Sequence, residues 1–308
     1  MRRFALGCSV VLIAVATGAR AQDVPTDYRQ VLTTLGKTGD YKAGVLKVAV
    51  PRNDLSVTVA GVKTPTAFGF GGWVALTKGN DGLDVMMGDL VLIEDEVNPV
   101  MSALLDQGLE VTALHNHFFW EEPRIFYMHV HGHGNAPDLA RQLKPALDLI
   151  GKGETRPTPA AGRAAAPPRG TMNTARLAEI VGVTGEQTGE VYKITIGRDD
   201  LKLTEMGAPI TARMGLNTWA AFLGTDERAA VAGDVAMLAG EVTPVLKALR
   251  KAGLDVVAIH QHMLQTEPPI YFLHYWGTGP AERLAAGVKA AVAELGKTAA
   301  APPVRPAR

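Results

Sequence analysis

The chain has 308 residues, of which 47% are hydrophobic and 20% are charged, a composition typical of a globular protein large enough for two domains. Its 31 lysines and arginines balance 31 aspartates and glutamates. No overall charge therefore attracts the protein to nucleic acid or to an anionic membrane surface, and we expect no nucleic-acid partner.

The first 21 residues have the pattern of a secretory signal peptide. Two arginines precede an apolar stretch over residues 4–16, and Ala19-Arg20-Ala21 forms a small-x-small cleavage motif. This apolar stretch is shorter than the span of about 20 residues that a membrane-crossing helix needs. We expect cleavage near Ala21 and a mature periplasmic or secreted protein without a stable membrane anchor.

The only cysteine, Cys8, lies inside this predicted signal peptide. It precedes most of the apolar stretch, where the cysteine of a lipoprotein signal would follow it. Cleavage leaves a mature chain without a thiol, which excludes cysteine nucleophiles, disulfides and thiolate metal ligands. Any metal ion must therefore be held by histidine, carboxylate or water.

Alternating or apolar runs predict four strands early in the mature chain, then a helix, two further strands and a second helix. The helices are expected from Pro99 to about Asp106, with Asn98 as N-cap and Gly108 as the stop signal, and over about residues 137–150. The order predicts an α+β fold, a mostly antiparallel sheet with helices on one face, related to the ferredoxin-like sandwich. The expected strands cover residues 45–50, 55–59, 71–76, 89–93, 110–119 and 124–130.

A motif of three histidines and a Glu-Pro pair occurs twice, at an offset of 145 residues. Its members are His115, His117, Glu122, Pro123 and His129 in the first copy and His260, His262, Glu267, Pro268 and His274 in the second. Gly88-Asp89 likewise recurs as Gly233-Asp234, and farther upstream Trp73 recurs as Trp219 at an offset of 146. The mature chain is therefore expected to consist of two tandem repeats. We expect the tryptophans to anchor the cores, with the wall of a ligand pocket as the alternative.

The repeats divide the chain into five expected segments. A region rich in proline, alanine and glycine separates the two copies, and a proline-containing tail ends the chain. The expected segments are the signal peptide 1–21, repeat unit 22–150, linker 151–173, repeat unit 174–296 and disordered tail 297–308.

The histidines of each copy are expected to share one face of a β-hairpin. Residues two apart in a strand point to the same side, and a turn centred near Glu122 places His115 opposite His129 and His117 opposite Tyr127. Opposite residues have Cβ atoms about 4.5–5.5 Å apart, from which two imidazoles can bind one ion at about 2.0–2.1 Å. The face expected to pack on the core carries Leu114, Phe118, Phe126, Met128 and Val130.

This pattern favours metal coordination, because imidazoles and carboxylates are ligands of zinc and copper sites. The candidate metal ligands are His115, His117, His129, His131, His133, His260, His262 and His274. Glu122 and Glu267 are candidate general bases, and Glu122 is also a candidate fourth ligand. Trp276 and Thr278 replace His131 and His133 in the second copy, so the first copy is expected to be the stronger or the only site.

Structural alternatives exist for each of these interpretations. A single histidine in a strand is often a hydrogen-bonded side chain without a metal. Asp54 and Asp200 are expected to form turn-stabilising ion pairs with the arginines two residues before them. Glu96 and Glu241 are expected to interact with helix N-termini. His-x-His followed by glutamate also resembles the first metal motif of the cupin barrels, although the helix predicted upstream of it is foreign to that fold.

The two copies together resemble the LppY/LpqO-like family of exported bacterial proteins, a domain of unknown function. The resemblance is carried by Glu-Val-x-Pro-Val at residues 96–100 and 241–245, and by Gly-Leu-Glu/Asp-Val followed by His-x-His at 108–117 and 253–262. It implies an exported or lipid-anchored protein with two such units and no assigned chemistry. Because this chain has no lipoprotein cleavage site, membrane anchoring is not expected here.

We expect from these observations a protein that binds a divalent metal, with zinc as the default and copper as the alternative. An open coordination position would let the ion activate water for hydrolysis. The alternative is a metal-independent module that binds a cell-envelope glycan or another small ligand, and a third reading is a purely structural exported protein. The sequence leaves open the oligomeric state and whether the two histidine faces meet.

Overall fold

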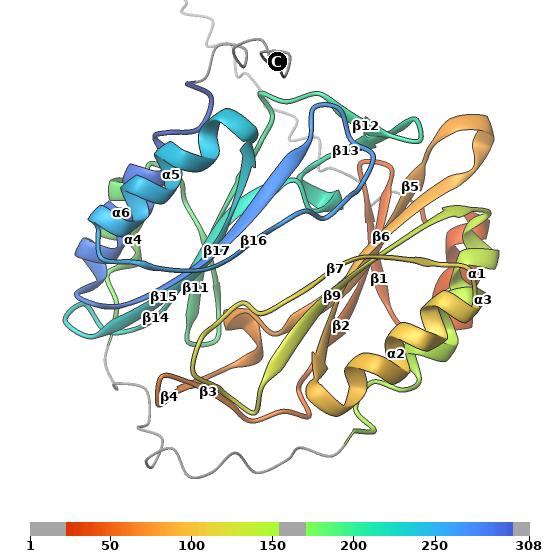
Figure 1. Ribbon diagram of the computed structural model, residues 1–308, viewed down its shortest axis with the longest axis horizontal. Helices are drawn as coiled ribbons and strands as arrows, with labels where there is room; N and C mark the ends of the chain where they lie inside the picture. The colour runs from red at the N-terminus through yellow and green to blue at the C-terminus, as the bar shows by residue number, and fades with distance from the viewer. Residues whose placement is uncertain (1–22, 154–170, 298–308) are drawn as a thin grey trace, which may run out of the picture.

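The computed structural model describes residues 23–153 and 171–297, in which the two repeats form two tandem α+β domains, as predicted. Each domain has one six-stranded sheet with helices on its outer side, and the two sheets face each other (Figure 1). Within the described residues neither sheet closes into a barrel, so the fold is not that of a cupin. The predicted signal peptide, most of the predicted linker and the predicted tail beyond Lys297 lie outside the described residues.

The first sheet is antiparallel between all neighbouring strands. Its strands, in spatial order, are β1 (Gly39–Lys42), β2 (Val45–Pro51), β5 (Gly71–Lys78), β6 (Asp84–Ile93), β9 (Ile125–Gly134) and β7 (Glu110–His115). Because β9 pairs antiparallel with both β6 and β7, those two strands run parallel to each other, with a helix connecting them. This is the split β-α-β unit that characterises ferredoxin-like folds.

The second sheet repeats this arrangement. Its strands, in spatial order, are β10 (Glu186–Thr188), β11 (Val191–Gly197), β14 (Asn217–Gly224), β15 (Ala229–Leu238), β17 (Ile270–Gly279) and β16 (Asp255–His260). The shared topology means that equivalent side chains of the two repeats occupy equivalent places on their sheets.

Three helices cover the outer face of each sheet (Figure 1). They are α1 (Thr26–Leu35), α2 (Glu94–Asp106) and α3 (Ala136–Leu147) in the first domain, and α4 (Thr174–Val181), α5 (Ala239–Lys251) and α6 (Ala281–Val292) in the second. Each set buries its apolar side against its own sheet, as Leu143 and Leu284 illustrate at 0% and 1% exposure. Among the described residues, none of these helices has the length and apolar character needed to cross a bilayer.

The inner faces of the two sheets pack on each other through apolar side chains from both domains. Phe118 of the first repeat, for example, lies edge-on to Trp276 of the second, with 5.7 Å between ring centroids. Short strands close the edges of this interface. They are β3 (Val57–Val59), β4 (Val62–Thr64) and β8 (Glu121–Glu122) in one small sheet, and β12 (Leu203–Glu205) and β13 (Ala208–Ile210) in another.

Helix α2 begins at Glu94, five residues before the predicted start at Pro99. Asn98 is therefore not its N-cap. Glu96 instead accepts a hydrogen bond from the backbone N–H of Ile93 at 3.0 Å. It also forms an ion pair with Arg52 at 2.6 Å. These contacts fix the first turn of the helix. The expected ion pair between Arg52 and Asp54 also forms, at 2.8 Å.

Candidate metal centre

A row of three side chains crosses each sheet on the face that looks toward the other domain. In the first sheet Trp73, Asp89 and His129 lie directly opposite one another on β5, β6 and β9. Opposite residues on neighbouring strands share a face. The equivalent row in the second sheet consists of Trp219, Asp234 and His274. The symmetric placement of one carboxylate beside one imidazole is thus built into the strand register.

The remaining histidines come from the end of the neighbouring strand, in a register that differs from the prediction. A β-bulge between Val111 and Ala113 places His115 opposite Tyr127, and Ala113 opposite His129. Strand β7 ends at His115, so His117 lies in the loop that follows and has no strand partner. The imidazoles nevertheless converge, because Nε2 of His115 lies 2.9 Å from Nε2 of His129.

The second copy has the same geometry, and the two copies meet at the interface between the sheets. Nε2 of His260 lies 2.9 Å from Nε2 of His274. Rings from different repeats stack in three pairs. The operation that relates the repeats maps the first pair below onto itself and exchanges the other two. Their centroid distances are 3.7 Å for His115 and His260, 3.6 Å for His117 and His274, and 4.0 Å for His129 and His262. The histidine faces therefore lie toward each other, one of the two arrangements that the sequence left open.

Two groups of three histidines are close enough to hold a metal ion. The first comprises His115, His260 and His274, and the second His129, His260 and His262, with ligand nitrogens within 4.8 Å of one another in each. Both groups combine residues of the two repeats. The two short Nε2 to Nε2 separations of 2.9 Å are hydrogen-bond distances, shorter than the roughly 3.3 Å between ligand atoms of a tetrahedral zinc ion. Of these two pairs, only His260 and His274 belong to one three-histidine group. The prediction that the first copy holds the stronger or only site did not foresee this sharing.

These imidazoles are uncharged near neutral pH. Burial lowers the pKa of His115 to about 4 and that of His260 to about 2. Burial, followed by repulsion from neighbouring histidines, also holds the pKa of His117, His262 and His274 well below the usual value. Because a metal binds the neutral form of imidazole, the fold keeps this cluster in the state that coordination requires.

Several ring nitrogens in the cluster are buried without a hydrogen-bond partner among the described residues. They are Nδ1 and Nε2 of His117 and Nδ1 of His262. Leaving such a group unpaired costs about 1–3 kcal/mol. Ordinary hydrogen-bonded core histidines would account for the two close Nε2 pairs but not for these atoms. A bound cation would give lone pairs of this kind a partner.

The other sequence-predicted residues lie apart from the two histidine groups. His131 is buried between two carboxylates, with Nδ1 3.2 Å from Glu110 and Nε2 3.5 Å from Glu205, while His133 is exposed. Glu122 is half-buried on β8, where it pairs with Thr58 of β3. Glu267 is exposed, and both Glu-Pro peptide bonds are cis.

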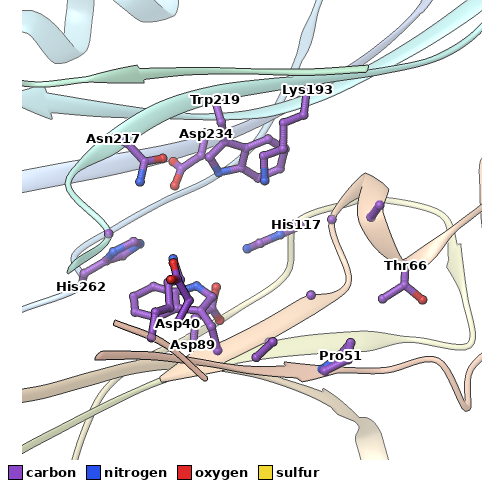
Figure 2. A pocket seen from close by; sticks show the side chains of 18 of the residues that line it. Asp40, Pro51, Thr66, Asp89, His117, Lys193, Asn217, Trp219, Asp234 and His262 are labelled. Carbon is purple, nitrogen blue, oxygen red and sulfur yellow. The ribbon is translucent and has the colours of Figure 1, made fainter. Parts of the chain in front are cut away.

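A cavity of about 640 Å³ adjoins the histidines and is lined by both repeats. Figure 2 shows Lys193, Trp219 and Asp234 on one wall, Asp89 on the facing wall, and His117 and His262 at the sides. The first repeat contributes the equivalent Lys47 and Trp73. The tryptophans thus line a pocket, which was the alternative, and they also pack against the cores between the sheets, which was the role expected first.

Burial shifts the pKa values of the charged groups that line the cavity. Burial raises the pKa of Asp89 to about 7 and holds that of Asp234 well above the usual value, with repulsion from Asp89 as the next cause. Burial, followed by repulsion from Lys193 and Arg213, lowers the pKa of Lys47 to about 8. Each lysine ammonium lies 4.2 Å from the centroid of its tryptophan ring.

Sequence reasoning did not single out the lysines or the aspartates as site residues. The duplicated Gly88-Asp89 and Gly233-Asp234 contained a usable signal, because a charged residue repeated inside an apolar strand requires a reason. Lys47 and Lys193 recur at the same offset of 146 as the tryptophans. An alternating strand with an outward lysine is so common that this match was not distinctive.

Comparison with known proteins gives a family but no function. The chain is similar to the trimeric bacterial microcompartment shell protein PduB at 12% identity, with 84% of this chain and 91% of that chain covered and a TM-score of 0.21. It is similar to EtuB from Clostridium kluyveri at 7% identity, with 84% and 89% covered and a TM-score of 0.20. These TM-scores are too low to support any argument, and no curated protein matches. A family model described as Domain of Unknown Function (DUF1259) matches residues 29–149 and again residues 175–294, so the chain belongs to this family and contains two tandem copies of its domain.

Proposed function

We propose that the protein is an exported, periplasmic or secreted metal-binding protein with one metal centre built jointly by its two repeats. The observation that carries this proposal is the pair of three-histidine groups, each drawn from both repeats. The imidazoles of both groups are neutral and buried or half-buried, and Nδ1 of His262 in the second group is unpaired. The proposed ligands are therefore His260 together with either His115 and His274 or His129 and His262, with His117 beside them.

The ligand chemistry favours zinc, with copper as the alternative. Imidazole suits both ions, and the only cysteine of the chain lies in the predicted signal peptide. Methionine sulfur near the site would favour copper. Met128, however, packs in the core on the helix side of its sheet, whereas Met263 packs between the sheets. One of the two methionines that would favour copper thus faces away from the histidines.

Three protein ligands leave a coordination position for water or substrate, which is typical of catalytic zinc. An ion there would supply Lewis acidity and lower the pKa of a bound water molecule. In a hydrolytic reaction, Asp89 and Asp234 are better placed as general bases than Glu122 and Glu267, because they line the cavity beside His129 and His274. We regard hydrolysis as an extension of the metal-binding proposal.

Elemental analysis tests the proposal directly. The full chain is purified without a histidine tag, dialysed, and its transition metals are measured before and after titration with zinc and copper. We expect at least one tightly bound ion per chain, lost in the double variant His115→Ala/His260→Ala and retained in the exposed control His133→Ala. Absence of bound metal together with absence of uptake on titration contradicts the proposal.

A second candidate function is a metal-independent module that binds a small cell-envelope molecule. The cavity of about 640 Å³ with two tryptophans favours it, because this volume lies in the range of small-molecule sites. Ligand affinity that is unchanged by a chelator would support this candidate over the metal centre.

The assignment to the LppY/LpqO-like group and the export of the protein belong to the same proposal. They are supported by the two Glu-Val-x-Pro-Val and His-x-His motifs and by the N-terminal segment that ends at Ala21. N-terminal sequencing of the protein recovered from the periplasm or the medium tests export. A first residue at or near Gln22 is expected, and retention of Met1 in the cytoplasm contradicts it.

A further inference from the structure

Two lysines face the same cavity from opposite domains. Lys47 lies on β2 of the first sheet and Lys193 at the equivalent position on β11 of the second, and both line the cavity beside the histidines. They are close enough to each other for mutual repulsion to lower the pKa of Lys47. The cavity therefore concentrates two positive charges near the symmetry axis of the repeats.

Neither ammonium group has a hydrogen bond or an ion pair within the described part of the chain. Each one instead lies over the face of its own tryptophan, Trp73 or Trp219, at 4.2 Å from the ring centroid. A cation–π contact holds an ammonium from one side only, and its remaining N–H donors stay available. The tryptophans thus fix the direction of the lysines without neutralising them.

The resident acids do not neutralise the cavity once a metal is present. Asp89 and Asp234 supply at most two negative charges, which the two lysines already balance. Asp40 at the edge of the cavity is paired with Arg213 at 2.8 Å. A divalent ion held by neutral imidazoles therefore leaves the cavity with a net positive charge, in surroundings where an unbalanced charge is costly.

From this arrangement we infer that the cavity binds a small oxyanion, a carboxylate or a phosphate, between Lys47 and Lys193 and next to the proposed metal ion. The inference deepens the proposed function and rests on it, because the excess positive charge comes from the metal. The anion accepts charge-assisted hydrogen bonds from both ammonium groups and has access to the open coordination position of the ion. The substrate or ligand class of the protein is then a small organic acid or a phosphorylated small molecule.

Calorimetric titration of the zinc-loaded full chain tests this inference, with excess zinc removed beforehand. The probes are inorganic phosphate, succinate and, as a neutral comparison, glucose. The test variant is Lys47→Gln/Lys193→Gln, and its matched control is Lys63→Gln/Lys202→Gln, which removes two exposed lysines and the same total charge. Zinc content and melting temperature are measured for every protein.

We expect phosphate or succinate, but not glucose, to bind with one anion per chain. Affinity should fall at least about tenfold in the Lys47/Lys193 variant and stay unchanged in the control. The stronger of the two anions identifies the source of the oxyanion. Equal affinity in both double variants, or no anion binding by a protein that holds zinc, overturns the inference while leaving the metal centre intact.

A chain that binds no zinc calls for a separate test of the lysine site. If the chain takes up no zinc, the same titrations are made in the presence of chelator. Anion binding that still depends on Lys47 and Lys193 then supports an anion site formed by the two lysines without a metal. The absence of such binding overturns the inference.

Discussion

His115 stacks on His260 with 3.7 Å between ring centroids, and the two residues are equivalent in their repeats. Equivalent residues in contact lie at the axis that relates the two copies, as in an isologous dimer interface. The same operation exchanges the stacked pair His117 and His274 with the pair His262 and His129. The candidate metal centre is therefore not a property of either repeat but of their pseudo-twofold arrangement.

Single substitutions on either side of this axis should weaken metal binding. His115→Ala removes an imidazole from one three-histidine group and His260→Ala removes one from both groups, and we expect each to weaken zinc binding by at least about tenfold. Competition with a chromogenic chelator measures the affinity. If only the substitution in the first repeat weakens binding, the shared centre is wrong and the sequence-based preference for the first copy is right.

Metal retention should extend to mildly acidic pH. Because the pKa values of His115 and His260 are lowered to about 4 and about 2, protons do not compete with the metal until the pH falls well below 6.5, the ordinary value for histidine. Zinc content after dialysis at a series of pH values measures this. Half-release near pH 6.5 contradicts the burial of the ligands.

The same pKa shifts predict the pH dependence of stability in the metal-free protein. Below the ordinary pKa of 6.5, unfolded histidines take up protons that His115 and His260 in the folded chain do not. The unfolded state then binds more protons, so the free energy of unfolding should decrease as the pH falls below about 6.5. Urea unfolding of the chelated protein between pH 5 and 8 checks the sign. A variant with His115→Gln and His260→Gln should show a smaller dependence.

Removing one partner of a buried ion pair should strongly destabilise the second domain. Glu241 is fully buried and accepts hydrogen bonds from Arg198 at 2.8 Å and from the backbone N–H groups of Leu238 and Gly296. Glu241→Gln leaves Arg198 without its buried counter-charge, a loss of about 3–5 kcal/mol. Urea unfolding measures it.

The control for that experiment is Asp200→Asn, because Asp200 pairs with the same arginine but its side chain is 46% exposed. A surface ion pair contributes about 0–1 kcal/mol. Equal losses in the free energy of unfolding for the two variants would show that the buried ion pair stabilises the domain no more than the exposed one.

Anion binding should weaken as the pH rises through about 8. Burial lowers the pKa of Lys47 to about that value, so a rise from pH 7 to 9 removes the charge that attracts the anion. Lys47→Arg keeps a positive charge at pH 9 and should flatten the dependence. Calorimetric titration of phosphate or succinate at both pH values makes the comparison. A wild-type affinity that does not change with pH argues against Lys47 as a contact.

Much of the fold could be predicted from the sequence because it depends on local patterns and on the internal repeat. Alternation predicted the strands, and the offset of 145 predicted two similar α+β domains, which the family match confirms. Helix α1 was not predicted. It lies before the first strand that the alternation indicated. The start of α2 was misplaced because its first turn is stabilised by Arg52, a residue 44 positions from Glu96, rather than by a local capping side chain.

The site was less predictable because its geometry depends on contacts between the repeats. The bulge at Val111 shifted the expected pairing of His115. Leu114, expected in the core, is 40% exposed, whereas Phe118 is buried as expected, in the core between the two sheets. No periodicity in one copy indicates which rings of the other copy will stack on it.

The cross-strand rows that end in His129 and His274 have a consequence for the origin of the protein. Two separate chains with one unit each could assemble the same centre as a homodimer, but only at concentrations that favour association. Fusion into one chain makes the partner permanently available. It also releases each copy from the requirement to be identical, which is visible where His131 of one half corresponds to Trp276 of the other. Covalent linkage thus allows a twofold centre to acquire an asymmetric environment.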